Sequence, residues 1–158
     1  MEARRARRDH ITKLFEITRE DIRRGTEVGV DYFATRPSER TPLQEAKVTL
    51  ADREIRSAIP IVIGPHPELN NRSRDEAERR FEDLIAELTG GNFQASDGEV
   101  DREQIRRLTH AGAGLRSALA RMRDAELRML ASDDMAQNVW KRFLNWLDRK
   151  AGVDPPRP

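Results

Sequence analysis

Three histidines are the side chains best able to do acid–base or metal chemistry near neutral pH. They are His10, His66 and His110, and none has a second metal ligand at helical or hairpin spacing. Cysteine is absent, which excludes a thiolate nucleophile, a thiolate metal site and a disulfide. The sequence therefore predicts no metal site and no cofactor.

Catalytic motifs that depend on glycine do not occur in a suitable context. Phosphate-binding loops, dinucleotide-binding loops and nucleophile elbows need glycine in a strand-to-helix turn, and no predicted strand precedes a glycine here. Adjacent acidic pairs such as Glu20-Asp21 and Asp133-Asp134 point about 100° apart on a helix, so they cannot act as a facing pair. We expect a protein that is not an enzyme and has no small-molecule substrate.

A basic cluster near the N-terminus is the strongest local charge in the chain. Its members are Arg4, Arg5, Arg7 and Arg8, and cations at a helix start oppose the helix dipole. Such a cluster can contact nucleic-acid phosphates, acidic lipid headgroups or an acidic protein. The other interpretation is a frayed, solvated helix end.

Aromatic and cationic residues alternate near the C-terminus, at Trp140, Lys141, Arg142, Phe143 and Trp146. Single-strand nucleic-acid binders use this mixture because bases stack on rings. The spacing of Phe143 and Trp146 instead indicates the inner face of a helix, which leaves Trp140 as the candidate exposed aromatic residue.

The whole composition predicts one soluble domain. The chain has 158 residues, of which 36% are charged and 37% hydrophobic, and its formal net charge is +1. A balanced charge gives no global field toward nucleic acid or anionic lipid. No apolar run approaches the ~20 residues of a membrane span, and no secretory signal is seen, so we expect a cytoplasmic location.

Five helices follow from the apolar periodicity and the capping signals. The first, basic helix covers 3–35. The second begins with a capping box at Thr41-Pro42-Leu43-Gln44 and ends near Ser57 or Ala58, because Pro60 cannot continue the hydrogen-bond ladder. Residues 61–63 are then expected to be a short extended piece.

The remaining helices lie in the second half of the chain. The third begins at a capping box formed by Ser73-Arg74-Asp75-Glu76 and is closed by Gly90-Gly91. The fourth, a long central helix, runs from about residue 100 to 130, and the fifth begins after Ser132-Asp133-Asp134. We expect an all-α, antiparallel helical bundle over 1–152 and a flexible, Pro-rich tail over 153–158.

Small residues follow one face of the central helix. Large residues recur every seven positions and alanines lie between them, across Gly112 and Gly114. Two glycines inside a helix cost about 1–2 kcal/mol, so they indicate either close packing of another helix, in this chain or a second copy, or a hinge. The candidate helix-packing or oligomer seam consists of Leu108, Ala111, Gly112, Leu115, Ala118, Met122 and Ala125.

Gly90-Gly91-Asn92-Phe93, Ala111-Gly112 and Leu115-Arg116-Ser117-Ala118-Leu119 give the chain a resemblance to a family of small, uncharacterised bacterial helical proteins. These proteins place a cytosolic helical region behind an N-terminal membrane anchor. The resemblance covers residues 3–130 and implies an architecture without an activity. No anchor is present here, although Glu2 to Arg8 has the charge of a cytoplasmic flank beside a span. The resemblance therefore implies membrane contact only if an anchor precedes Met1 in the native protein.

The sequence thus predicts a non-enzymatic, helical protein–protein interaction module, on its own or as a homo-oligomer, in the cytoplasm or at the cytoplasmic face of a membrane. The alternative is a nucleic-acid-binding protein that uses Arg4, Arg5, Arg7 and Arg8.

Overall fold

A computed structural model describes the backbone of residues 2–64, 71–91 and 93–150. Side chains are described in the same ranges except at residues 2–4, 7, 71 and 133–150. Within these ranges the chain forms four α-helices and one short 3-10 helix, with no strand. The all-α class is confirmed, and the number of helices, predicted as five, is corrected to four. The predicted tail, 153–158, lies outside the described residues.

The first helix, α1 (Glu2–Ala34), extends through two internal glycines. Its apolar residues bury one face, from Ile11 and Phe15 to Tyr32 and Phe33. A Cβ on Gly29 would lie 2.6 Å from both Leu88 Cδ1 and Leu108 Cδ2. The missing side chain thus lets α1 approach two other helices, which explains why a residue of low helix propensity lies inside α1.

The second helix, α2 (Pro42–Ile63), follows the short 3-10 helix η1 (Pro37–Glu39). The predicted capping box is present: the Gln44 backbone N–H donates to Thr41 Oγ1, and the Thr41 backbone N–H donates to Gln44 Oε1. The predicted end near Ser57 or Ala58 is wrong, and so is the extended piece over 61–63. The helix continues through Pro60, because Ile59, Val62 and Ile63 are buried and their packing offsets the lost backbone hydrogen bond.

The third helix, α3 (Asn71–Thr89), begins two residues before the predicted cap. Ser73 therefore lies within the first turn and is not the N-cap. The predicted closure is confirmed, since the helix ends at Thr89 and Gly91 adopts a φ of +61°. Glycine adopts that conformation without the steric cost that a side chain adds.

The fourth helix, α4 (Arg102–Lys150), is one continuous helix of 49 residues, about 73 Å long. The predicted break after Ser132-Asp133-Asp134 is wrong. These three residues are common N-caps but are also tolerated inside helices at modest cost. Because no glycine or proline lies between Leu115 and Lys150, no residue there forces the helix to end.

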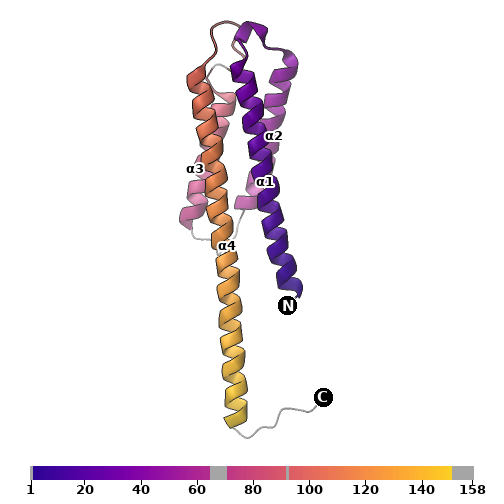
Figure 1. Cartoon of the computed structure of the whole chain (residues 1–158), viewed down its shortest axis with the longest axis vertical. Coiled ribbons are helices and arrows are strands. Elements are labelled where there is room, and N and C mark those ends of the chain that lie inside the picture. The colour runs from indigo at the N-terminus through magenta and orange to yellow at the C-terminus, as the bar shows by residue number, and fades with distance from the viewer. Residues whose placement is uncertain (1, 65–70, 92, 151–158) are drawn as a thin grey trace.

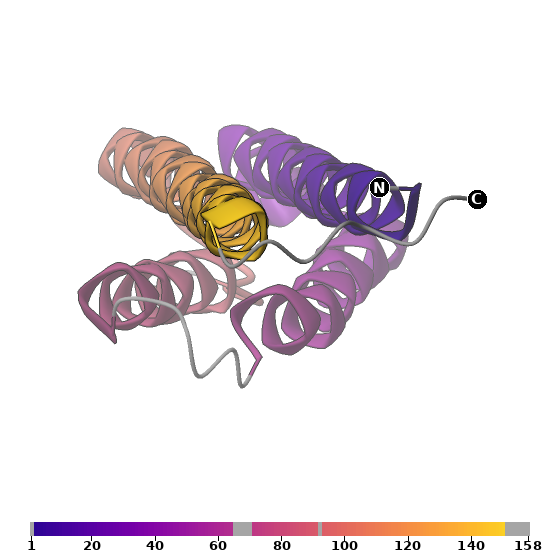
Figure 2. The same ribbon diagram turned by 90° about the horizontal axis from the view of Figure 1, so that it is seen from below.

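The four helices form a bundle with a ring-like order (Figures 1 and 2). Viewed from below, α1, α2, α3 and α4 follow one another around the ring, and α4 closes it beside α1. In Figure 1 the chain ascends α1, descends α2, ascends α3 and descends α4. The C-terminal part of α4 continues beyond the lower ends of the other three helices. This part, which ends at Lys150, is called the α4 extension below.

The core lies along the axis of the bundle and draws on every helix. Thr18 and Thr26 are also buried, and each satisfies its hydroxyl by donating to the backbone carbonyl four residues earlier, Leu14 O and Ile22 O. The largest fully buried side chains are Tyr32, Phe15, Phe33, Ile22, Ile55, Leu84, Leu88, Leu108, Leu115, Leu119, Met122 and Gln104.

Aromatic residues fix the end of the bundle where α1 meets the loop before α4. The Tyr32 ring lies 5.2 Å from the Phe33 ring and 5.4 Å from the Phe93 ring, centroid to centroid. The Arg40 guanidinium lies 4.3 Å from the Tyr32 centroid, a cation–π distance. The Tyr32 hydroxyl oxygen accepts a hydrogen bond of 3.0 Å from the Gln94 backbone N–H. These contacts hold the loop against α1. No helix within the described ranges is long and apolar enough to span a membrane.

Candidate interaction surfaces

The small-residue seam of α4 packs inside the chain. Leu108, Ala111, Gly112, Leu115, Ala118 and Met122 are all buried, and Ala125 is half-buried. A Cβ on Gly112 would overlap Thr26 Oγ1 of α1, so the closest helix at this point is α1 of the same chain. The helix runs unbroken through Gly112 and Gly114. The seam is therefore a contact within the bundle, and its surface is already covered.

The basic cluster lies on the first turns of α1, at the lower end of the bundle. Arg5 and Arg8 are exposed, and neither makes an ion pair with a described side chain. The side chains of Arg4 and Arg7 lie outside the described residues. The side chain of Trp140 also lies outside the described residues, and only its backbone position on α4 is described.

The histidines are not brought together by the fold. His10 and His110 are exposed on α1 and α4, and His66 lies outside the described residues. No group of three or more possible metal ligands occurs among the described side chains.

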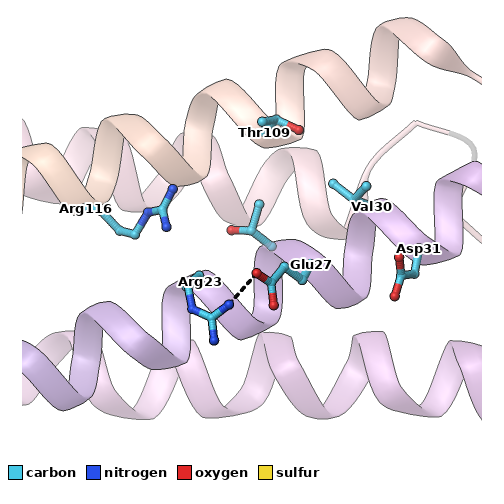
Figure 3. Close-up of a pocket in the computed structure, with 7 residues that line it drawn as sticks. Arg23, Glu27, Val30, Asp31, Thr109 and Arg116 are labelled. Atoms are coloured by element: carbon cyan, nitrogen blue, oxygen red, sulfur yellow. Dashed lines mark hydrogen bonds and ion pairs between the residues drawn. The ribbon is translucent and has the colours of Figure 1, made fainter.

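A shallow groove of about 320 Å³ runs between α1 and α4 (Figure 3). Its walls carry charges of both signs, and Arg23 donates to Glu27 Oε1 at 2.5 Å across one turn of α1. Arg23 also donates to both oxygens of Glu20, at 2.6 and 2.9 Å. The lining residues are Arg23, Thr26, Glu27, Val30, Asp31, Thr109 and Arg116.

The electrostatics of this groove come mainly from ion pairs within α1. The hydrogen bond from Arg23 lowers the pKa of Glu20, and Glu20 in turn raises the pKa of Arg23 above its usual range. The hydroxyls of Thr26 and Thr109 donate to backbone carbonyls of their own helices. Two arginines and two carboxylates in one shallow groove give no net preference for an anion or a cation. We therefore assign no chemistry to the groove.

Exposed apolar residues form a more distinctive surface. Four large apolar side chains among those described have half or more of their surface exposed, namely Ile17 (50%), Leu43 (65%), Leu50 (55%) and Ile61 (63%). Three of them lie on α2 at spacings of seven and eleven residues, which are close to whole numbers of helical turns. Leu43, Leu50 and Ile61 therefore share one line along α2.

The direction of this line follows from the contact between α1 and α2. A Cβ on Gly25 would lie 2.6 Å from Ile55 Cδ1 and 3.5 Å from Ala51 Cβ, so Ala51 and Ile55 mark the side of α2 that faces α1. At about 100° per residue, Leu43, Leu50 and Ile61 lie about 80–100° from Ala51 and about 120–140° from Ile55, turned away from the core. They therefore flank the outer side of the boundary between α1 and α2.

Ile17 belongs to the same face. Gly25 lies opposite Ala51 and Ile55, and the Gln44 side-chain amide donates to Thr35 Oγ1 at 3.2 Å. This register places Ile17 level with Ile61. Ile17 lies about 80° from Gly25, on the side away from the Thr26 contact with α4. The four residues Ile17, Leu43, Leu50 and Ile61 are called the α1/α2 stripe below.

The sequence contains a pattern that indicates part of this stripe, but helical periodicity alone does not show that the pattern marks an exposed face. Leu43, Leu50 and Ile61 form a second apolar line on a helix whose inner line is Val48, Ala51, Ile55 and Val62. Neither line identifies Ile17 as a neighbour. Ile17 can be placed beside α2 only when the register between α1 and α2 is known.

Comparison of the chain with family models, with curated proteins and with solved structures found no match.

Proposed function

We propose that this chain is a non-enzymatic interaction module that binds a helical protein segment along the α1/α2 stripe. The observation that carries the proposal is that the four most exposed large apolar side chains described all follow one face. Scattered apolar residues are normal on a protein surface, whereas apolar residues gathered on one face mark interaction sites. Three of these side chains lie on α2 and one, Ile17, lies on α1, so they flank a helix–helix boundary, a shape that accepts a third helix.

The stripe alone supports only a weak complex. Complete burial of a Leu or Ile side chain contributes about 1.5–3 kcal/mol. Covering four side chains that are already partly buried therefore contributes roughly 3–6 kcal/mol. Association itself costs about 4–15 kcal/mol. A stable partner must supply apolar surface of its own, or the contact must occur more than once in the complex.

A site-specific photo-crosslinker tests the proposal. Placed at Leu50 in the full chain and activated in the native host, it should give a discrete adduct that mass spectrometry identifies, and the adduct should be lost in the Ile17→Gln/Ile61→Gln variant. The matched control is the same crosslinker at Arg53, which is exposed on α2 but lies outside the stripe. Equal adducts at both positions, or none at Leu50, would overturn the proposal.

Nucleic-acid binding through the N-terminal arginines is the second candidate function. It is favoured by one observation: Arg5 and Arg8 are exposed and make no ion pair with a described side chain. If they contact phosphates, affinity for a DNA or RNA duplex should fall steeply as salt rises and should weaken when Arg5 and Arg8 become Gln. Absence of binding at low salt would exclude this function.

A further inference from the structure

The outer face of α2 carries two charges as well as the apolar residues of the α1/α2 stripe. Lys47 lies between Leu43 and Leu50, and Glu54 lies between Leu50 and Ile61. At about 100° per residue, these five positions fall within about 60° of one another around the helix, and all five are exposed. In Figure 2, α2 has α1 and α3 beside it and turns its outer side away from the ring. The five residues are called the α2 line below.

The two charges of the α2 line are unpaired among the described side chains. Neither Lys47 nor Glu54 makes an ion pair there, whereas Asp52 and Arg56, on the same helix outside the line, pair with each other at 3.0 Å. The line therefore presents one positive and one negative group, with apolar side chains between and beyond them, to a molecule outside the bundle.

The order of the residues along the α2 line is complementary to its own reverse. From Leu43 to Ile61 the line is apolar, positive, apolar, negative and apolar. A second copy of the line, laid antiparallel, brings its negative residue to the positive residue of the first and its positive residue to the negative one. A parallel copy would place like charges beside each other, which is unfavourable. The charge pattern therefore fits a second, antiparallel copy of this helix.

The rise of the helix determines how the two lines meet. When the twofold axis passes midway between Leu43 and Ile61, Leu43 of one copy lies level with Ile61 of the other. Lys47 then lies about 4.5 Å along the helix axis from Glu54 of the other copy, and the two Leu50 residues lie about 6 Å apart along it. These offsets are about one helical turn or less. Every residue of the line therefore has a suitable counterpart in one register.

The neighbours of the α2 line permit a close approach. Ala46 and Ser57 border the line, and both are small and exposed. The distance between packed helices depends on the side chains at their contact, so small residues here let a second helix come near. On the other border, Ile17 of α1 lies level with Ile61. Leu43 of the other copy would thus contact an apolar pair contributed by two helices.

We propose that two copies of the chain form an antiparallel, twofold dimer through the α2 line. This dimer rests on the proposed function and identifies its helical segment as α2 of a second copy. A twofold interface presents the same surface from both copies, so each contact occurs twice. Two Lys47–Glu54 ion pairs and two Leu43–Ile61 contacts flank the central Leu50 pair. This doubling answers the weakness of a single stripe.

Charge reversal tests the pairing. Light scattering on the full chain across a range of concentrations should show the mass of one chain at low concentration and of two chains at high concentration. Lys47→Glu and Glu54→Lys each place like charges together at both ion pairs, so each should shift the midpoint to about tenfold higher concentration or more. The Lys47→Glu/Glu54→Lys variant restores opposite charges and should dimerise as the wild type does. A midpoint that neither single reversal changes would overturn the dimer.

Mixing the two single variants tests the same contact between different chains. The Lys47→Glu chain has two negative residues on its line and the Glu54→Lys chain has two positive ones. Their mixture should therefore form heterodimers at lower concentration than either variant alone dimerises. A mixture that behaves as the average of its components would overturn the dimer.

Two exposed charges on α3 provide the matched controls for these reversals. Arg79→Glu and Glu82→Lys lie outside the α2 line, so each should keep the wild-type midpoint and their mixture should gain nothing. Circular dichroism shows whether each variant keeps its helical content.

Cysteine crosslinking tests the direction of the two helices, since the chain contains no native cysteine. In an antiparallel dimer, a short bismaleimide should join a Leu43→Cys chain to an Ile61→Cys chain. A Thr49→Cys chain, altered at an exposed position of α2 outside the line, is the control and should join to neither. Adducts formed only between two Leu43→Cys chains or two Ile61→Cys chains would show a parallel arrangement and overturn the inference.

Failure of the inference and failure of the proposed function are distinguishable. A chain that is monomeric at every concentration, while the crosslinker at Leu50 captures a different identified protein, overturns the dimer alone. A monomeric chain with no adduct at Leu50 overturns both.

Discussion

Gly112 and Gly114 lie two residues apart on α4, but only Gly112 faces another helix closely. A Cβ on Gly112 would overlap Thr26 Oγ1, and it would lie 3.2 Å from Thr26 Cβ. Around Gly114 the nearest atom is Arg80 Cδ at 3.4 Å, which is an ordinary contact with a flexible side chain. The same substitution should therefore have opposite effects at the two positions.

We expect Gly112→Ala to lower the free energy of unfolding by on the order of 1 kcal/mol, because overpacking against Thr26 outweighs the gain in helix propensity. Gly114→Ala should raise it by about 0.5–1 kcal/mol, because only the propensity gain applies. Urea denaturation of both variants gives the comparison. A shift in the same direction at both sites would contradict the close contact between α1 and α4.

Two exposed carboxylates have lowered pKa values for the same reason. The hydrogen bond from Arg23 lowers the pKa of Glu20, and the hydrogen bond from Arg106 lowers that of Glu103. Each arginine lies three residues after its carboxylate. A carboxylate with a lowered pKa in the folded state contributes stability above its ordinary value of 4.5. That contribution is lost as the pH falls through the lowered pKa.

The Glu20→Gln/Glu103→Gln variant should accordingly be slightly less stable than the wild type at neutral pH. The difference should shrink as the pH falls from about 5 to about 3. Salt should shrink it too, because both pairs are exposed to solvent. Thermal unfolding at several pH values measures it. A difference that grows in acid would show that these carboxylates do not contribute through their ion pairs.

At the scale of the helix, α2 shows how burial outweighs a local breaker. Pro60 lacks the N–H that would donate to the Arg56 carbonyl, and its ring crowds the preceding turn. The helix nevertheless continues to Ile63, since Ile59, Val62 and Ile63 all enter the core. The proline itself is exposed, so it contributes little to that packing.

Replacing Pro60 with alanine should therefore raise the free energy of unfolding by roughly 1–3 kcal/mol. Ser57→Ala, an exposed substitution one turn earlier on α2, is the comparison and should change stability by only a few tenths of a kcal/mol. Chemical denaturation, followed by the helical circular dichroism signal, measures the free energy of unfolding of both variants. A less stable Pro60→Ala variant would indicate that the proline is needed to set the direction of the chain after α2.

The same helices show what the sequence can and cannot predict. The Thr41 capping box and the closure at Gly91 depend on nearby residues alone, so local chemistry predicted both correctly. The end of α2 and the continuity of α4 through Ser132 could not be predicted in this way, because the same residues can cap a helix or lie within it. The α1/α2 stripe was missed because it depends on which residues of two separate helices lie side by side.

At the scale of the molecule, we expect the bundle to fold without the α4 extension. The buried side chains described run from Ile11 to Glu126. A chain that ends at Ser132 therefore retains every described core residue.

We expect this shortened chain to unfold cooperatively at a temperature within a few degrees of the full chain, when both are compared at a concentration where the full chain is monomeric. The helical circular dichroism signal of the shortened chain should fall only in proportion to the number of helical residues removed. Calorimetry and circular dichroism test this directly. Loss of cooperative unfolding would show that residues after Ser132 stabilise the bundle.

The positions of the aromatic residues divide the molecule into two parts that can be observed separately by spectroscopy. The single tyrosine, Tyr32, is fully buried in the bundle, whereas Trp140 and Trp146, the only tryptophans, both lie in the α4 extension. Tryptophan emission therefore reports on the C-terminal part of α4 and whatever covers it, whereas helical content, followed by circular dichroism, reports mainly on the bundle. Without any label, a single titration can distinguish changes at that part of α4 from unfolding of the bundle.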